Sequence, residues 1–257
     1  MLTFKHTNIF FSVVLLTLLV SSRFMHVPLF VYPMVLFIYS LIVFYGCYYI
    51  ASDFFMKIHC KAVTGEKVIA ISFDDGPVKE HTPKVLEILK QHNAPAAFFF
   101  IGNRVAGNEK LLQQVIDEGH LVGNHSYSHH TWFDLFSTSK VIADMKLMDE
   151  TMKAVTGLKP RLFRPPYGVM NPNIKQAIVK GEYIPVGWSV RSFDTVEKDG
   201  NKLLQKMTAA IEPGAVFLFH DSGKQTISIL PAFLKKVLEN GYQIVALDKM
   251  LHLQPYA

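Results

Sequence analysis

Cysteine is scarce in this sequence of 257 residues, which contains only Cys47 and Cys60. Two cysteines cannot build a disulfide-rich scaffold or a four-thiolate zinc or iron–sulfur site. Charge is also sparse: 18% of the residues are charged and 50% are hydrophobic, whereas an average protein has about 25% charged residues. This composition excludes a mainly disordered chain. Ordinary numbers of glycine (15) and proline (13) exclude collagen-like and low-complexity sequences.

The few charges are unevenly distributed along the chain. The first 60 residues hold three basic side chains and one acidic one. The remainder holds 23 basic and 20 acidic residues, so its charge is nearly balanced. No stretch combines clustered basic residues with interleaved aromatic residues, as nucleic-acid-binding surfaces often do. We therefore expect no nucleic-acid partner.

Two long apolar runs occupy the N-terminal part. Pro28–Ile50 is a run of 23 residues without a charge, and about 20 apolar residues span a bilayer. The shorter run Asn8–Val20 precedes it. We expect residues 1–60 to form a membrane anchor, a hairpin of transmembrane helices at about 8–22 and 28–50 joined by a tight loop. Two alternatives are a single anchor preceded by a signal-like segment and a helix in a soluble core. The flanking charges do not decide the orientation.

Residues 61–257 alternate short apolar runs with amphipathic stretches, and they predict one catalytic domain. The apolar runs are rich in β-branched and aromatic residues and predict strands, whereas the stretches between them predict helices. Strands are expected at 68–73, 96–101, 120–122, 161–163, 184–190, 215–219 and 243–247. Helices are expected at 82–92, 109–118, 140–155, 173–180, 202–211 and 229–240. Alternation of this kind predicts an α/β fold with parallel strands, here a distorted (β/α) barrel of about seven strands.

Unusual polar residues follow these strands directly. The pair Asp74-Asp75 follows the first strand, His125 and His129 the third, and Arg164 the fourth; Asp194 and His220 follow later strands. Each could have an ordinary structural reason, such as a turn, a helix cap or a surface ion pair. However, the carboxyl ends of strands in a (β/α) barrel share one rim, where active sites are built. Their common placement therefore predicts a functional site.

The residue types suit metal-assisted hydrolysis. His125 and His129 are four residues apart, so one helical turn would bring both imidazoles to one face. A carboxylate from Asp74 or Asp75 would complete a set of two histidines and one carboxylate, with positions left open for water. The other carboxylate could accept a proton from that water, with an arginine keeping it ionised, and a histidine could protonate the leaving group. Such a set can hydrolyse an amide or an ester.

Four short motifs occur in a characteristic order: SFDDG at 72–76, HSYSH at 125–129, RPPY at 164–167 and LFH at 218–220. In this order they resemble the polysaccharide deacetylase family, also called carbohydrate esterase family 4, with its NodB-type domain. The stretch ENGYQIVAL at 239–247 resembles the last helix and strand of that family. The resemblance extends over about residues 67–247.

The resemblance implies a site residue by residue. Asp75, His125 and His129 would bind a divalent metal, most often zinc, with cobalt or another transition metal as alternatives. The resemblance makes Asp74 the general base, Arg164 the residue that holds it and His220 the general acid. The backbone N–H of Tyr167 would stabilise the oxyanion, and Leu218 and Trp188 would shape a pocket for the acetyl methyl group.

One motif departs from the family pattern. The family has Trp-x-x-Asp-x-x-Asp-Trp where this sequence has WSVRSFDT at 188–195. Arg191 replaces the first aspartate, which in the family pairs with the arginine that holds the base, and Thr195 replaces the second tryptophan. Asp194 remains. We expect Asp194 to lie at the substrate site and to take over as the partner of Arg164.

The resemblance implies a hydrolase of non-peptide C–N bonds, which removes acetyl groups from a glycan. With an anchor, the partners would be the lipid bilayer and peptidoglycan, an exported polysaccharide or a lipid-linked sugar. The catalytic domain would then be extracytoplasmic in an integral membrane protein. The alternatives are hydrolysis of another C–N bond, which the altered motif keeps open, and a non-catalytic glycan-binding role. Retention of both Asp74 and His220 argues against the last of these.

Overall fold

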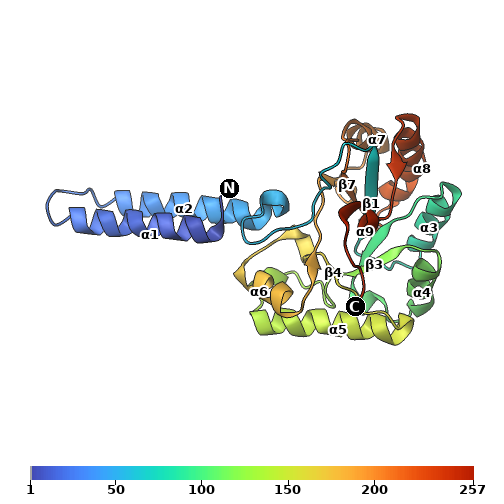
Figure 1. The fold of residues 1–257 in the computed structure, drawn as a ribbon, viewed down its shortest axis with the longest axis horizontal. Coiled ribbons are helices and arrows are strands. Elements are labelled where there is room, and N and C mark those ends of the chain that lie inside the picture. Colours follow the sequence, from blue (N-terminus) through green and yellow to red (C-terminus); the bar gives the residue numbers. More distant parts are fainter. Residues whose placement is uncertain (1) are drawn as a thin grey trace.

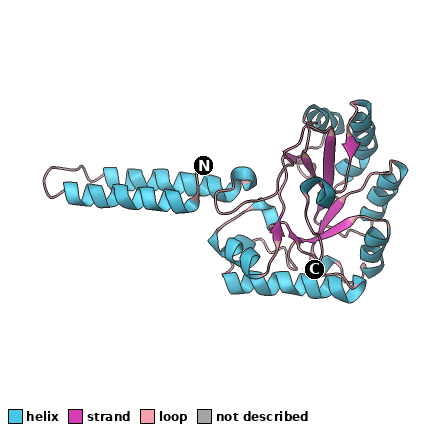
Figure 2. Cartoon of the chain, in the orientation of Figure 1, coloured by secondary structure: helices cyan, strands magenta, loops and turns pink. Residues whose placement is uncertain are grey.

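The N-terminal part is a helical hairpin that projects from a globular α/β part (Figure 1, Figure 2). The computed structural model describes residues 2–257. Helix α1 (Phe4–Ser21) runs away from the globular part, and helix α2 (Val31–Tyr48) returns antiparallel to it. Each helix has 18 residues, which makes it about 27 Å long. By length and composition both could cross a membrane, with mean hydropathies of 1.5 and 1.7.

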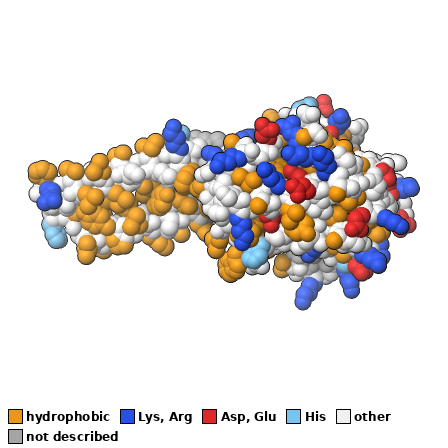
Figure 3. All heavy atoms as spheres, turned by 90° about the horizontal axis from the view of Figure 1, so that it is seen from below, with side chains coloured by type: hydrophobic (Ala, Val, Ile, Leu, Met, Phe, Trp, Pro, Cys, Tyr) orange, Lys and Arg blue, Asp and Glu red, His pale blue; other side chains and the backbone are white. Residues whose placement is uncertain are grey.

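The hairpin is held together by a narrow seam of contacts. The Tyr39 hydroxyl donates a hydrogen bond to Asn8 Oδ1 (2.9 Å), and the Tyr39 ring packs against Phe11. Only four residues of the two helices are buried: Thr7, Phe11, Val35 and Gly46. Most of the other apolar side chains of the two helices are exposed (Figure 3). These helices are therefore not core helices of the globular part.

The segment that follows the hairpin is part of the core of the globular part. It contains the short helix η1 (Ile50–Ser52), and five of its side chains are buried: Ile50, Phe54, Phe55, Ile58 and Cys60. These side chains pack in one cluster with residues from the second half of the sheet and from its covering helices. The backbone of this segment also pairs with the barrel, through His59 with Val186 and Lys61 with Ala215. The hairpin and the barrel are thus joined by a packed segment.

The barrel consists of parallel strands in the order β5-β4-β3-β2-β1-β7-β6, with β8 paired to β1. The sheet curls into a half-barrel (Figure 2). The strand bounds are β1 Val68–Asp74, β2 Ala97–Phe100, β3 Leu121–Asn124, β4 Leu162–Phe163, β5 Ile184–Pro185, β6 Val190–Arg191, β7 Val216–His220 and β8 Gln243–Ile244. The central strands β1, β2 and β7 are buried along nearly their whole length, as strands covered on both faces are.

Helices cover the outer face of this sheet (Figure 1). They are α3 Thr82–Gln91, α4 Glu109–Asp117, α5 Thr138–Thr156, α6 Pro172–Lys180, α7 Gly200–Ala209, α8 Lys224–Glu239 and α9 Leu247–Leu251, with short turns η2 Gly102–Arg104, η3 Phe133–Leu135 and η4 Pro166–Gly168. The largest core cluster lies between the sheet and these helices and is rich in phenylalanine. This arrangement confirms the predicted (β/α) barrel.

Three predicted elements differ in detail from the structure. The run 184–190, predicted as one strand, forms two strands, β5 and β6, which lie at opposite ends of the strand order. The backbone between them pairs with both edges, because Val186 N–H donates to Phe163 and Ser189 N–H to Val216. Helix α8 begins at Lys224, five residues earlier than predicted, and the run 243–247 ends in the unpredicted helix α9.

Gly214 tests how tightly the base of the barrel is packed. Its φ is 74°, and a Cβ atom there would collide with the Ala62 carbonyl oxygen. Gly107 has a φ of 80° but open space around the Cβ position. We expect Gly107→Ala to cost about 1 kcal/mol for the left-handed backbone alone. Gly214→Ala should cost about 3 kcal/mol, because crowding adds to the same strain. Urea unfolding of the two variants measures the difference, and equal losses would contradict the packing described here.

Candidate functional site

The predicted polar residues meet at the carboxyl ends of the strands. Asp74 is the last residue of β1 and His220 the last of β7, and these positions are paired in register. His125 follows β3 directly. Because parallel strands end at one rim, these side chains converge there. Asp74, His125 and His220 are all buried, with at most 8% of each residue exposed.

Asp75, His125 and His129 form a group of side chains that could hold a metal ion. This group of three side chains is called the metal cluster below. The Nε2 atoms of His125 and His129 lie 3.5 Å and 3.4 Å from Asp75 Oδ1. Ligand atoms at about 2.0–2.1 Å from a tetrahedral zinc ion would be about 3.3 Å apart. The spacing of these atoms therefore fits one ion bound between them.

Hydrogen bonding prepares the ligand atoms. His125 Nδ1 lies 2.8 Å from the Arg164 carbonyl oxygen, a contact that places the proton on Nδ1 and leaves the lone pair of Nε2 for a metal. Burial lowers the pKa of His129 to about 4, so that its imidazole is neutral at neutral pH. Burial raises the pKa of Asp75, but when His125 carries a second proton, on Nε2, its hydrogen bond and charge hold that pKa below its usual range.

The histidine pair is not carried by a helix, contrary to the expectation from its spacing. Residues 125–129 form a loop in which Ser126 and His129 have φ values of 66° and 44°. The backbone N–H groups of Tyr127 and Ser128 donate to Asp144 Oδ1 on α5, and the N–H of Ser126 donates to Asn124 Oδ1. These bonds fold the loop so that the two imidazole rings lie 4.9 Å apart.

Arg164 is fully buried and binds Asp74 directly. Its Nη1 donates to Asp74 Oδ1 at 2.6 Å and to the Ser72 hydroxyl at 2.9 Å. Its Nε and Nη2 donate to the carbonyl oxygens of Val186 (3.2 Å) and Gly187 (2.8 Å). Burial lowers the pKa of Arg164, and the charge of Asp74 opposes that change. The second oxygen of Asp74, Oδ2, lies 3.8 Å from His125 Nε2 and thus faces the metal cluster.

Asp194 is the partner of His220, so the expectation that it pairs with Arg164 is wrong. Asp194 Oδ1 lies 2.7 Å from His220 Nδ1, and Oδ2 accepts the His220 backbone N–H at 2.7 Å and the Thr226 hydroxyl. The Asp194 side chain has no exposed surface, so it lies behind His220, away from any substrate. Burial alone would lower the pKa of His220, but the hydrogen bond and charge of Asp194 raise it.

The remaining predicted residues lie around the metal cluster. The ring of Tyr167 packs edge-on against His129, 4.7 Å between centroids, and Tyr167 has a φ of 60°. The Trp188 ring fills the space next to Gly168, where a Cβ atom would collide with it. Leu218 is 1% exposed. Tyr167 therefore borders the metal cluster, Trp188 lies against the next residue, Gly168, and Leu218 is buried in β7.

Arg164 has hydrogen-bond partners for its guanidinium although the motif at 188–195 departs from the family pattern. Arg191 stacks its guanidinium near Trp188 (5.5 Å) and Phe193 (4.9 Å), and Thr195 is exposed. The hydrogen bonds of Arg164 go to Asp74, Ser72 and the two carbonyl groups named above. These oxygens satisfy the guanidinium without the aspartate that Arg191 replaces.

Several supporting residues were missed by sequence reasoning. Ser72 could have been found, because it alternates with Asp74 along β1 and so shares its inward face. Asp144 and Thr226 gave no such signal, since each acts through a contact far away in the sequence. Asn124 bonds the backbone of Ser126, only two residues away, but the motifs did not single it out. Asp221 is fully buried beside Gly76 and accepts a hydrogen bond from Thr82, and burial raises its pKa to about 7.

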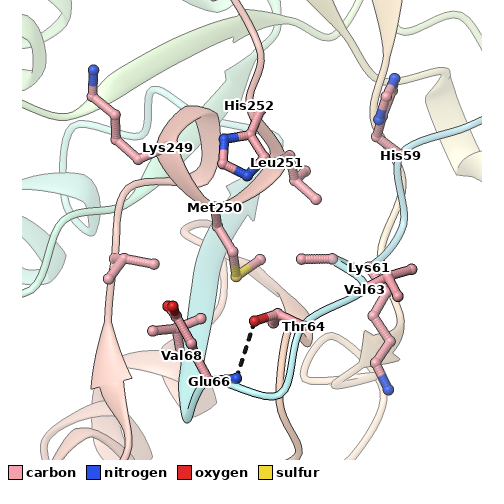
Figure 4. Close-up of a pocket in the computed structure, with 12 residues that line it drawn as sticks. His59, Lys61, Val63, Thr64, Glu66, Val68, Lys249, Met250, Leu251 and His252 are labelled. Carbon is pink, nitrogen blue, oxygen red and sulfur yellow. Dashed lines mark hydrogen bonds between the residues drawn. The ribbon is translucent and has the colours of Figure 1, made fainter.

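A separate cavity of about 460 Å³ lies at the other end of β1, next to its first residue, Val68. Thr64 and Met250 point into it (Figure 4). It is lined mainly by residues of the segment between the hairpin and β1 and by residues in and after α9. None of them belongs to the metal cluster. We therefore do not associate this cavity with the chemistry at the rim.

Comparison with known proteins agrees with this geometry. The sequence profile of the family described as polysaccharide deacetylase matches residues 61–185. A peptidoglycan-N-acetylglucosamine deacetylase of Bacillus cereus is 34% identical over 196 residues, which cover 72% of this chain and 71% of that protein. A peptidoglycan-N-acetylglucosamine deacetylase of Listeria monocytogenes is 35% identical over 74% of this chain. The chain spans only 40% of the length of that Listeria relative.

Solved structures show the same fold. The crystal structure of a peptidoglycan N-acetylglucosamine deacetylase matches with a TM-score of 0.74 and 26% identity, over 78% of this chain and 95% of that one. A CE4 family pseudoenzyme from Bacillus anthracis matches with a TM-score of 0.69 and 27% identity, over 75% of this chain and 68% of that one. The fold is thus shared by a protein described as a deacetylase and by one described as a pseudoenzyme.

The metal cluster predicts the effect of single substitutions. Asp75→Ala, His125→Ala and His129→Ala each remove one of three ligands, so each should weaken zinc binding at least 10-fold. His130→Ala is the matched control, because His130 is the exposed neighbour of His129 and lies outside the cluster. Competition of the full-length protein with a zinc-sensitive dye measures the affinity. Unchanged affinity in the three variants would show that the ion binds elsewhere.

Proposed function

Because the chain belongs to the polysaccharide deacetylase family, we propose that it is a membrane-anchored, metal-dependent deacetylase of cell-envelope glycan. The reaction is hydrolysis of the N-acetyl group of N-acetylglucosamine-type sugars. The observation that carries the proposal is the arrangement around Asp75, His125 and His129: a carboxylate held by a buried arginine, and a histidine held by a buried carboxylate. A protein that only binds glycan has no need of either pair.

The cluster of Asp75, His125 and His129 is the candidate site for the ion. Its two imidazoles and one carboxylate are ligands that zinc prefers, and cobalt is an alternative. When bound, such an ion polarises the acetyl carbonyl group and makes water a stronger acid.

Asp74 is proposed to remove the proton from the attacking water. Its Oδ1 accepts a hydrogen bond from Arg164, whereas Oδ2 is directed toward the metal cluster. A guanidinium remains charged at any relevant pH, so it keeps the carboxylate ionised and oriented. Because Arg164 is anchored by two backbone carbonyl groups as well, Asp74 is held in place when it accepts the proton.

His220 is proposed to protonate the leaving amine. The bond from Nδ1 to Asp194 orients the ring so that Nε2 points away from Asp194. The raised pKa of His220, caused by Asp194 against the effect of burial, keeps the imidazole protonated to a higher pH. A histidine that carries a proton near neutral pH is an effective general acid.

The acetyl group is proposed to lie next to the metal cluster. Trp188 and Leu218 would enclose the methyl group, and the backbone N–H of Tyr167 would donate to the developing oxyanion. The positive φ of Tyr167 turns its peptide relative to a normal extended loop, which supports such a role. Relatives named for peptidoglycan and for chitooligosaccharide support a sugar with an N-acetyl group as the substrate.

The hairpin is proposed to anchor the protein in a lipid bilayer. Its outward-facing side chains are almost entirely apolar, and at least 18 large apolar side chains between Leu2 and Tyr49 are exposed. Such a surface is unfavourable in water, and two helices of about 27 Å suit the bilayer core of about 30 Å. A hairpin keeps both ends of the chain on one side of the membrane, and we place the catalytic domain on the outer side, where envelope glycan lies.

Substitution of the base tests the reaction. The full-length protein should release acetate from an N-acetylglucosamine oligomer, stop when a chelator removes the metal, and recover when zinc or cobalt is added. Asp74→Asn should bind the metal normally but release acetate about 10²–10⁴-fold more slowly, because the proton acceptor is lost. Full activity in Asp74→Asn would refute the assignment of the base. Normal metal binding without acetate release by the wild-type protein would refute deacetylation of this sugar.

The pH profile tests the acid. If protonated His220 is required, kcat/KM falls as the pH rises through the pKa of His220. Asp194→Asn removes the negative charge that raises this pKa, so the alkaline limb should move to lower pH. Thr226→Val removes only the second hydrogen bond to Asp194 and should move the limb less. An alkaline limb at the same pH in Asp194→Asn and the wild type would assign that limb to another group.

A further inference from the structure

Two loops of the candidate site end against the hairpin. The loop that contains Tyr167 reaches Met170, whose backbone N–H donates to the carbonyl oxygen of Cys47 in the last turn of α2 at 2.9 Å. The next residue, Asn171, donates from its side chain to the carbonyl oxygen of Asp134 at 2.6 Å. The short helix η3, which includes Asp134, therefore lies beside the loop that contacts the end of α2.

The second loop starts from His129 and leads directly into η3. Two large apolar side chains of this segment, Trp132 and Leu135, are 61% and 71% exposed, although their neighbours Phe133 and Phe136 are buried in the cluster that also contacts Cys47. Exposure of both side chains is unfavourable in water. Nothing in residues 2–257 covers them.

The end of α2 carries side chains of the same kind. Tyr45, Tyr48 and Tyr49 are each more than half exposed. Tryptophan and tyrosine are enriched where a membrane-spanning helix meets the polar surface of the bilayer, because one end of each ring is apolar and the other can remain hydrated. Apolar side chains continue from the hairpin onto the adjoining edge of the globular part (Figure 3). Measured along the hairpin axis, α6 extends as far toward the hairpin as the end of α2 (Figure 1).

We propose that Trp132 and Leu135, together with the tyrosines at the end of α2, form a surface that rests on the lipid bilayer beside the hairpin. This surface, called the bilayer face below, rests on the proposed membrane anchor and extends it. The hairpin alone could tilt in the bilayer and carry the globular part that is packed against its end. Insertion of Trp132 and Leu135 into the headgroup region fixes that tilt and buries both side chains.

The bilayer face brings the site close to the membrane. Trp132 follows His129 by three positions in the chain, and Met170 follows Tyr167 by three. Three residues of chain span at most about 10 Å, so the backbone of His129, a member of the metal cluster, lies within roughly that distance of the backbone of Trp132. The enzyme would therefore act on sugars presented at the membrane surface, such as a glycan attached to a lipid.

Tryptophan fluorescence can test the bilayer face, because the chain contains only Trp132 and Trp188. The full-length Trp188→Phe variant, reconstituted into phosphatidylcholine–phosphatidylglycerol vesicles, reports on Trp132 alone. We expect lipids brominated near the top of their acyl chains to quench most of its emission, and aqueous iodide to quench little. The matched control adds Trp132→Phe and Val196→Trp. Val196 is 73% exposed in the loop before α7, a helix on the far side of the globular part from α6 (Figure 1). Its tryptophan should respond to iodide and not to bromolipid.

The outcomes separate this proposal from the anchor on which it rests. Vesicle flotation measures anchoring: a chain that fails to float with the vesicles refutes the anchor. A chain that floats, but whose Trp132 is quenched by iodide and not by bromolipid, refutes the bilayer face alone. If Trp188→Phe does not fold, the same comparison is made between the wild type and Trp132→Phe, where the bromolipid-sensitive fraction of the emission should disappear.

An activity measurement adds a second readout. The double variant Trp132→Ser and Leu135→Ser should release acetate from a soluble N-acetylglucosamine oligomer at the wild-type rate. Its rate on the same sugar attached to a lipid in vesicles should be several-fold lower. Equal rates of the variant and the wild type on both substrates would refute a role of the bilayer face in substrate access.

Discussion

The buried guanidinium of Arg164 joins more parts of this protein than any other side chain at the rim. It is supplied by the end of β4, binds Asp74 and Ser72 on β1, and donates to the carbonyl groups of Val186 and Gly187 in the segment that closes the barrel. Its own carbonyl oxygen orients His125. A buried charge that loses its partners costs several kcal/mol, so these bonds constrain one another. The position of the candidate base, one candidate metal ligand and the barrel closure thus depend on a single residue.

Two buried ion pairs flank the metal cluster, and they have opposite effects. Arg164 stabilises a negative charge on Asp74, whereas Asp194 stabilises a positive charge on His220. This difference between the two pairs matters because acid–base chemistry needs one group that is ready to accept a proton and another that is ready to donate one. Each pair is held by hydrogen bonds to the barrel itself, through Ser72 on one side and Thr226 on the other. The barrel thereby places a carboxylate beside a cation and an imidazole beside an anion at the same rim.

The sequence predicted the fold and the members of the site well, and the contacts between them less well. The strands and their polar ends were recognisable because apolar runs and the residues after them are local signals. The pairing of Asp194 with His220 was not, since both β6 and β7 end at the rim and either Arg164 or His220 could have been the partner. The division of 184–190 into two strands also had no local signal. It follows from closure of the barrel, where the same backbone must pair with β4 on one side and β7 on the other. The predicted helical turn for His125 and His129 failed for a related reason, because the bonds from Asn124 and Asp144 determine the loop.

The segment between the hairpin and β1 has a practical consequence for recombinant work. A fragment that begins at residue 61 would look like a clean catalytic domain, but it would lack Ile50, Phe54, Phe55, Ile58 and Cys60, which fill one of the cores of the barrel. Removal of these side chains leaves a hole next to Gly187 and Met170, on the same side as the site. Such a fragment would be prone to aggregation and its inactivity would say nothing about the enzyme. A truncation that begins at Tyr49 keeps these five side chains, but it still removes Phe4, Ile42 and Cys47, which pack against the same core. The hairpin is therefore part of what holds this side of the barrel together.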